Sequence, residues 1–172
     1  MSPAASMPAP TAASTTSGIV VIHASMSGNS EFLAEWIVDA LKAKGIQASV
    51  EHADAVTLDR LASLNDAIFV IPTWGSGEVP APAEPLYFAM QAASPTVPPA
   101  LAQLRYAMVA PGDTTYPDFC GGAKLFDEAV ARHGARRLGT ILMLDGIPME
   151  KHLNRLERWL NDVVQSRQLA QV

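Results

Sequence analysis

The stretch Ser25-Met26-Ser27-Gly28-Asn29-Ser30 carries the residue types in this sequence best suited to binding an anion. It joins an apolar run, residues 19–22, to a run with helical spacing that begins near Glu31. The first N–H groups of a helix have no partner within the helix, and the helix dipole is positive there. A phosphate group at this junction would accept hydrogen bonds from those N–H groups and from the serine hydroxyls. Because the stretch contains no Lys or Arg, we predict an uncharged cradle for one phosphate.

The spacing of this stretch differs from that of the two commoner phosphate loops. It has neither the Gly-Lys-Ser/Thr ending of a nucleoside-triphosphate loop nor the three glycines of a dinucleotide fingerprint. On its own it favours an ordinary helix start, with Ser27 or Asn29 as the N-cap residue and Glu31 in the first turn. The choice between these two interpretations depends on the rest of the chain.

The elements that must position this stretch alternate between strand and helix patterns. The sequence predicts strands over residues 19–24, 46–50, 67–71, 106–110 and 140–144, and helices over residues 31–44, 57–64, 83–93, 119–133 and 150–164. Five strands alternating with five helices imply an α/β fold, a doubly wound parallel sheet with right-handed crossovers and helices on both faces. The expected strand order is 2-1-3-4-5.

This strand order brings three loops together at one edge of the sheet. Strands 1, 3 and 4 are neighbours in it, and ligands bind where the strand order reverses. The second loop, residues 72–80, carries Trp74, and the third, residues 111–118, carries Asp113 and Tyr116. Trp74 and Tyr116 can sandwich a flat ring whose polar edge faces Asp113 and the loop backbone. A phosphate site beside a ring site describes flavin mononucleotide (FMN).

Length and composition fit one domain in a reducing compartment. A chain of 172 residues, 49% of them hydrophobic, buries roughly 70% of the surface that its unfolded form exposes. The one cysteine, Cys120, cannot form an internal disulfide, and no Cys/His cluster has metal-ligand spacing. We therefore predict no metal and a cytoplasmic location, with Cys120 as buried packing rather than a nucleophile.

The first 17 residues differ in composition from the rest of the chain. They carry no charge and consist mainly of Ala, Ser, Thr and Pro, which predicts a disordered tail rather than a signal peptide, followed by the domain over residues 18–172. No later apolar run approaches the ~20 residues that a membrane span needs. A net charge of −5 disfavours nucleic acid as the main partner and suits a basic protein partner.

Three motifs together resemble the flavodoxin family, especially its short-chain members, and the FMN domains of diflavin reductases. They are Ser25-Met26-Ser27-Gly28-Asn29-Ser30, Thr73-Trp74-Gly75, and Gly112-Asp113-Thr114-Thr115-Tyr116 followed by Pro117-Asp118-Phe119-Cys120-Gly121. The resemblance covers residues 18–164, and no insertion of the long-chain kind follows Leu144. It implies a flavodoxin-like fold, FMN as cofactor and electron transport, with no residue acting as acid, base or nucleophile.

The resemblance also implies the residues of the cofactor site. By this resemblance, the first motif binds the phosphate, and Trp74 and Tyr116 flank the two faces of the ring. Asp113 is the acidic residue at the edge of the ring. The full set of expected cofactor-binding residues is Ser25, Met26, Ser27, Gly28, Asn29, Ser30, Pro72, Thr73, Trp74, Gly75, Ser76, Gly77, Pro111, Gly112, Asp113, Tyr116, Phe119 and Cys120. The implied partners are redox proteins, with an NADPH-dependent reductase as electron donor and an acceptor enzyme that the sequence does not identify. The protein itself is expected to be a monomer.

Three features depart from the family pattern. Pro72 stands where many relatives have a hydroxyl residue near the phosphate, and it lacks an N–H donor. Ser76 stands where several short-chain relatives have an acid. A charge of −5 is small for a flavodoxin. The last two features concern the redox potential and the partner surface rather than the cofactor.

The sequence lacks the characteristic residues of two other classes of protein, receiver domains and serine hydrolases. A receiver domain needs a phosphorylatable Asp after strand 3 and a Lys after strand 5, where this chain has Pro72-Thr73 and Asp145-Gly146. A serine hydrolase needs a Gly-x-Ser-x-Gly turn, which is absent, so His23 at the end of strand 1 is interpreted as structural.

Two alternatives stay open. A flavin-dependent quinone reductase shares the fold and the cofactor, but it needs room over the ring that Tyr116 would restrict. The other is a binding or assembly module without flavin, which Pro72 would allow. The residues that argue against it are Trp74, Gly75, Asp113 and Tyr116.

Overall fold

The computed structural model describes residues 18–172, so the tail expected over residues 1–17 lies outside the described residues. The strands are β1 (Ile19–His23), β2 (Ala48–His52), β3 (Asp66–Val70), β4 (Arg105–Gly112), β5 (Arg136–Arg137) and β6 (Leu142–Asp145). The helices are α1 (Asn29–Ala43), α2 (Leu58–Ala62), α3 (Glu84–Ala92), α4 (Gly121–Arg132) and α5 (Leu153–Leu169), with short 3-10 segments η1 (Ala53–Ala55), η2 (Ala81–Ala83) and η3 (Met149–His152).

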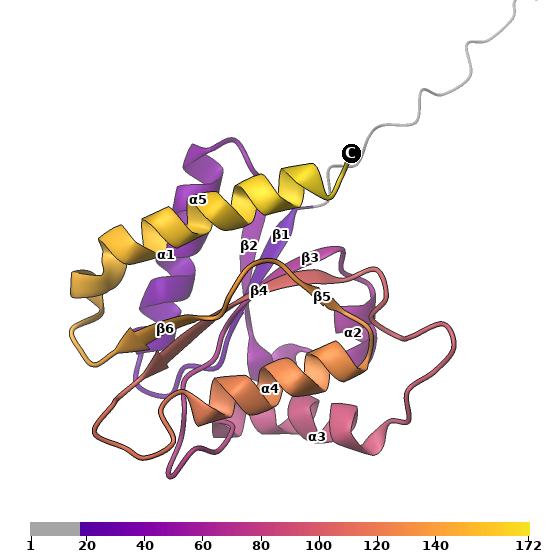
Figure 1. The fold of residues 1–172 in the computed structure, drawn as a ribbon, viewed down its shortest axis with the longest axis horizontal. Helices are drawn as coiled ribbons and strands as arrows, with labels where there is room; N and C mark the ends of the chain where they lie inside the picture. Colours follow the sequence, from indigo (N-terminus) through magenta and orange to yellow (C-terminus); the bar gives the residue numbers. More distant parts are fainter. Residues whose placement is uncertain (1–17) are drawn as a thin grey trace, which may run out of the picture.

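Within the described residues the strands form one parallel sheet in the order β2-β1-β3-β4-β5, and β6 also pairs with β4. Figure 1 shows α1 and α5 together on one face of this sheet and α3 and α4 on the other. The doubly wound α/β fold and the strand order predicted from the sequence are therefore confirmed.

The two faces of the sheet support two apolar cores. Successive side chains of a strand point to opposite faces, so Ile22 of β1 packs in one core and Val21 in the other. Every residue of β1 and β3 is buried, as expected for strands that helices cover on both sides. This packing fixes the carboxyl ends of β1, β3 and β4 at one edge of the sheet.

The fifth strand is the element in which the structure differs most from the expectation. Instead of one strand over residues 140–144, two segments pair with β4: β5 alongside its start and β6 alongside its end. Residues 138–141 separate the two segments. Because β5 consists of two exposed arginines, a search for apolar runs could not detect it.

The helix bounds agree with the periodicity apart from their ends. Thr57 caps α2 as expected, since its hydroxyl accepts a hydrogen bond from the Arg60 N–H at 3.1 Å. The helix α4 starts at Gly121 instead of residue 119, because Cys120 adopts a left-handed conformation with φ of 58°. The final helix continues beyond the expected end to Leu169. No helix of residues 18–172 is both long and apolar enough to cross a membrane.

Candidate cofactor site

A cavity of about 530 Å³ lies at the carboxyl edge of the sheet, within the usual size range of small-molecule sites. Its lining residues are Met26, Ser27, Asn29, Ser30, Pro72, Thr73, Trp74, Gly75, Pro80, Pro111, Gly112, Asp113, Tyr116, Asp118, Phe119, Cys120, Ile147 and Met149. The structure thus brings together the three loops that the sequence singled out. Of the expected cofactor-binding residues, Ser25, Gly28, Ser76 and Gly77 do not line the cavity.

The anion end of the cavity is the start of α1. The N-cap residue is Gly28, whose φ of 88° is left-handed, and no side chain caps the helix. The interpretation with Ser27 or Asn29 as capping residue is therefore wrong. Ser25 closes the loop instead, because its hydroxyl accepts a hydrogen bond from the Gly28 N–H at 2.9 Å. The first turn of α1 consequently keeps its N–H groups free of side-chain caps beside the cavity.

Two large aromatic side chains stand exposed at the cavity. Trp74 is 55% exposed and Tyr116 is 59% exposed, although both line the cavity wall. The backbone of Trp74 is held by Glu78 through two hydrogen bonds, Trp74 N–H to the Glu78 carbonyl at 3.0 Å and Glu78 N–H to the Trp74 carbonyl at 2.9 Å. Aromatic surface left open at the edge of a cavity is suited to packing against a flat ligand.

Gly75 is the position where this loop requires glycine. Its φ of 53° lies in the left-handed region, and a Cβ atom there would overlap the carboxylate of Glu78. That carboxylate also accepts a hydrogen bond from the Ser76 N–H at 3.3 Å. The turn after Trp74 is therefore specified by Gly75 and stabilised by Glu78.

The carboxylates around the third loop hold the loop itself. Asp113 accepts hydrogen bonds from the hydroxyl and the N–H of Thr115 at 2.6 and 2.8 Å, and these bonds lower the pKa of Asp113. Asp145, at the end of β6, accepts the N–H and the hydroxyl of Thr114, both at 2.8 Å, and its pKa is lowered for the same reason. Both carboxylates are thus ionised at neutral pH and shape the loop that presents Tyr116.

Cys120 lines the cavity from a buried position. Its side chain has no exposed surface, and its thiol donates to the Ala110 carbonyl at 3.2 Å. Burial raises the pKa of the Cys120 thiol to about 11, so the nucleophilic thiolate is scarce at neutral pH. The structure therefore agrees with the interpretation of Cys120 as packing.

Four residues line the cavity that were not expected from the sequence: Pro80, Asp118, Ile147 and Met149. Ile147 and Met149 follow β6, whose carboxyl end lies beside that of β4. The same edge rule that selected the other loops also applies to this connection, so the signal was available in the strand order. Ile147 is 68% exposed and adds an apolar wall to the cavity.

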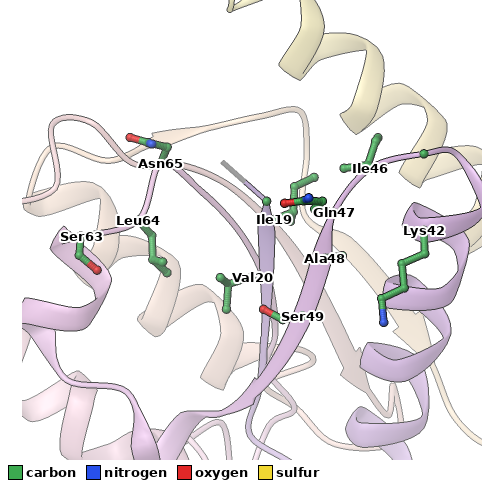
Figure 2. Close-up of a pocket in the computed structure, with 12 residues that line it drawn as sticks. Ile19, Val20, Lys42, Ile46, Gln47, Ala48, Ser49, Ser63, Leu64 and Asn65 are labelled. Carbon is green, nitrogen blue, oxygen red and sulfur yellow. The ribbon is translucent and has the colours of Figure 1, made fainter. Parts of the chain in front are cut away.

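A second hollow, of about 740 Å³, lies at the opposite edge of the sheet (Figure 2). It surrounds the amino ends of the strands, since Ile19 and Ala48 begin β1 and β2, and Asn65 directly precedes β3. Lys42 is the one charged residue that lines it. This hollow offers no pairing of groups for chemistry, and residues 18–172 contain no cluster of His, Cys, Asp and Glu suited to a metal. The cavity at the carboxyl edge is therefore the candidate site.

The fold and this site together define a class of protein. A doubly wound parallel sheet with a ligand cavity at the reversal of strand order, an uncapped helix start and two exposed aromatic residues is the arrangement of a mononucleotide-binding protein. The residues fit FMN in particular, because the cavity offers one anion end and one aromatic end.

Comparison with known proteins identifies the family. The family model described as Flavodoxin matches residues 21–159. Flavodoxin YqcA of Pectobacterium carotovorum subsp. carotovorum is 35% identical over 121 residues, which cover 70% of this chain and 77% of that protein. The chain therefore belongs to the flavodoxin family. It is an electron-transfer flavoprotein and its cofactor is FMN.

Further relatives include a larger flavoprotein and solved flavodoxins. The sulfite reductase (NADPH) flavoprotein alpha-component of Mannheimia succiniciproducens is 30% identical over 148 residues, which cover 86% of this chain but 24% of that protein. The chain thus spans about a quarter of that relative's length. Flavodoxin 2 from Bacillus cereus superposes with a TM-score of 0.76 at 25% identity, and the Streptococcus pneumonia TIGR4 flavodoxin with 0.74 at 26% identity; each match covers 87% of this chain and 99% of the other.

Proposed function

We propose that this flavodoxin carries single electrons from an NADPH-dependent reductase to an acceptor enzyme and is a carrier rather than an enzyme. The observation that supports this most is the joint position of the uncapped start of α1, Trp74 and Tyr116 on one cavity. FMN supplies the redox chemistry when bound, and the protein holds and orients it. The NADPH named in the sulfite reductase relatives supports a reductase of that kind as donor.

The proposal assigns a role to each part of the cavity. The first N–H groups of α1 and the side chains of Ser27, Asn29 and Ser30 bind the phosphate. Trp74 and Tyr116 cover the two faces of the ring and exclude water from it. Residues 18–172 form the FMN-binding domain, which works as a monomer in the cytoplasm. There the thiol of Cys120 stays reduced.

The chemistry of the lining residues favours a carrier over a quinone reductase. Asp113 is engaged by Thr115, and the raised pKa of Cys120 keeps that thiol protonated. Neither residue is placed to act as an acid, a base or a nucleophile at neutral pH. Tyr116 also lines the cavity, where under this proposal it restricts the room that a substrate would need over the ring.

The phosphate assignment is tested by Ser27→Ala. The loss of a hydrogen bond to a charged group costs ~1.5–3 kcal/mol, so FMN binding should weaken ~10–150-fold while riboflavin binding stays the same. The measurement is quenching of flavin fluorescence on titration into the apoprotein. Ser49→Ala, an exposed serine on β2 at the opposite hollow, is the matched control. An equal loss for FMN and riboflavin would contradict the assignment.

The carrier assignment is tested on the FMN-loaded protein with NADPH and a quinone. Oxidation of NADPH should stay at its background rate until an NADPH-dependent reductase is added, and the flavin absorbance should then bleach. Steady consumption of NADPH by the protein alone would identify it as a reductase.

A further inference from the structure

Two histidines contact the loop that precedes α1. His23 ends β1, His52 ends β2, and the two are partners in the register of these strands. Their rings pack edge to face with centroids 5.0 Å apart. His23 is 5% exposed, and neither histidine lines the cavity.

Both histidines contact the backbone of Ser25, the first residue of the loop. The Ser25 N–H donates to His23 Nδ1 at 3.4 Å, and His52 Nε2 lies 3.4 Å from the Ser25 carbonyl oxygen. Because Nδ1 of His23 accepts, that ring is neutral with its proton on Nε2. Burial, followed by the neighbouring His52, lowers the pKa of His23 and agrees with a neutral ring.

His52 is placed to carry a positive charge. Its Nδ1 lies 2.5 Å from Asp54 Oδ1, and its Nε2 faces the Ser25 carbonyl, so each ring nitrogen meets an acceptor. An imidazolium donates to both acceptors, whereas a neutral ring donates to one. The hydrogen bond that His52 donates to Asp54 raises the pKa of His52, and the Ser25 carbonyl adds to the rise.

The charges around this pair come from three elements. Asp54 of η1 and Glu31 of α1 favour the charged form of His52. The neutral His23 of β1 lies against the His52 ring, and Glu35 of α1 acts on His23. His52 thus places a cationic ring 3.4 Å from the backbone of a loop that contains neither Lys nor Arg.

We propose that His52 is a positioning residue for FMN binding: its imidazolium holds the Ser25 carbonyl and supplies the positive charge that the phosphate loop lacks. This inference rests on the proposed assignment of the phosphate to residues 25–30. The recognised group is a phosphate monoester with two negative charges. Riboflavin, which has the same ring and no phosphate, should be indifferent to His52.

The expected pH dependence has a definite sign. A bound dianion stabilises the imidazolium, so the pKa of His52 is higher in the complex than in the free protein. FMN affinity is then greatest below the free-protein pKa, falls as pH rises through the two values, and is constant above them. The phosphate of FMN loses its second proton near pH ~6, which affects every variant equally. The comparison therefore uses the difference in FMN affinity between variants at each pH.

The experiment measures the Kd of FMN and of riboflavin by fluorescence quenching between about pH 5.5 and pH 9. His52→Gln keeps an amide donor but no charge, and it should weaken FMN binding ~3–10-fold near pH 6 and not at pH 9. Asp54→Asn should move the loss of affinity to lower pH. His52→Arg, which stays charged, should bind FMN with little change across the range.

Glu51→Gln is the matched control, since it changes the adjacent charge on β2 and should leave the pH profile as it is. Parallel FMN profiles for His52→Gln and the unmodified protein would overturn the proposal while the preference for FMN over riboflavin stands. Equal affinity of the unmodified protein for FMN and riboflavin would instead remove the phosphate assignment, and the proposal with it. Thermal unfolding of each variant shows whether it has folded.

Discussion

At the scale of single residues, the proposed stacking of Trp74 and Tyr116 on the flavin ring can be tested by substitution. Their exposed surfaces have no covering element in the described part of the chain, and stacking of a planar ring on an aromatic side chain contributes ~1–3 kcal/mol. Trp74→Ala should therefore weaken FMN and riboflavin equally, by ~5–150-fold. FMN and riboflavin carry the same ring, so Trp74→Ala should weaken the binding of both. Ser27→Ala, in contrast, should weaken the binding of FMN alone.

The same residue should account for the change in tryptophan emission. FMN added to the apoprotein should quench tryptophan fluorescence, and Trp74→Phe should remove most of that quenching. Trp36 and Trp159 are the controls, because Trp36 packs against the core and Trp159 donates to the Thr140 carbonyl at 3.1 Å. If Trp74→Phe leaves the quenching unchanged, Trp74 does not cover the ring.

Residue types predicted the cavity well where each side chain acts alone. Ser27, Trp74 and Tyr116 were found because their hydroxyl and aromatic groups lie in loops that follow the strands β1, β3 and β4. His52 was not found, since its role depends on the register that places it beside His23. A pair of this kind becomes visible only when two strands are aligned.

At the scale of elements, the loop that carries Tyr116 is attached to β6 through Asp145. The two hydrogen bonds from Thr114 hold the loop against the end of that strand. Asp145→Asn replaces one accepting oxygen by a donor and breaks one bond, each bond being worth ~0.5–1.5 kcal/mol. FMN and riboflavin should then both bind ~2–10-fold more weakly, because the loop positions the ring rather than the phosphate.

The pH dependence of this contact follows from the lowered pKa of Asp145. The contribution of the ionised carboxylate is complete above its ordinary pKa and is lost as pH falls through the lowered folded-state value. Riboflavin titrations at neutral and at acidic pH would detect it. A variant that weakens FMN alone would show that Asp145 acts on the phosphate end instead.

Periodicity predicted the helices and the apolar strands, because burial on both faces of a parallel sheet leaves continuous apolar runs. It could not predict β5, whose two arginines pair with the start of β4 while their side chains stay exposed. The connection after β6 was missed for another reason. Ile147 and Met149 were not among the expected site residues, although the strand order places this connection at the cavity.

At the scale of the whole molecule, the end of the chain is tied to the middle of the sheet by a buried ion pair. Arg167 of α5 donates from Nε to Asp66 Oδ2 at 2.9 Å, and the side chains are 5% and 3% exposed. Arg105 of β4 donates to the same oxygen at 2.9 Å, and its Nε lies 2.8 Å from Oδ1. The contact between Arg105 Nε and Asp66 Oδ1 is an ion pair without the geometry of a hydrogen bond.

No periodicity in the sequence reveals this contact, because Asp66 and Arg167 are 101 positions apart. Its value to the fold follows from the cost of leaving a buried charge without its partner, ~3–5 kcal/mol. Asp66→Leu removes the carboxylate that both Arg105 and Arg167 contact and should lower the free energy of unfolding by about this amount. Arg167→Met should lower it by less, since Asp66 keeps Arg105.

Urea unfolding of the apoprotein measures these differences directly. Arg60→Met is the control, because Arg60 pairs with Glu51 on the surface and such pairs contribute ~0–1 kcal/mol. The order of destabilisation should be Asp66→Leu first, Arg167→Met second and Arg60→Met last. If Arg167→Met proved as costly as Asp66→Leu, Arg105 alone would not balance the buried charge of Asp66. Since Met keeps most of the apolar bulk of Arg, that cost would come from the lost guanidinium, and the ion pair would be what holds α5 to the sheet.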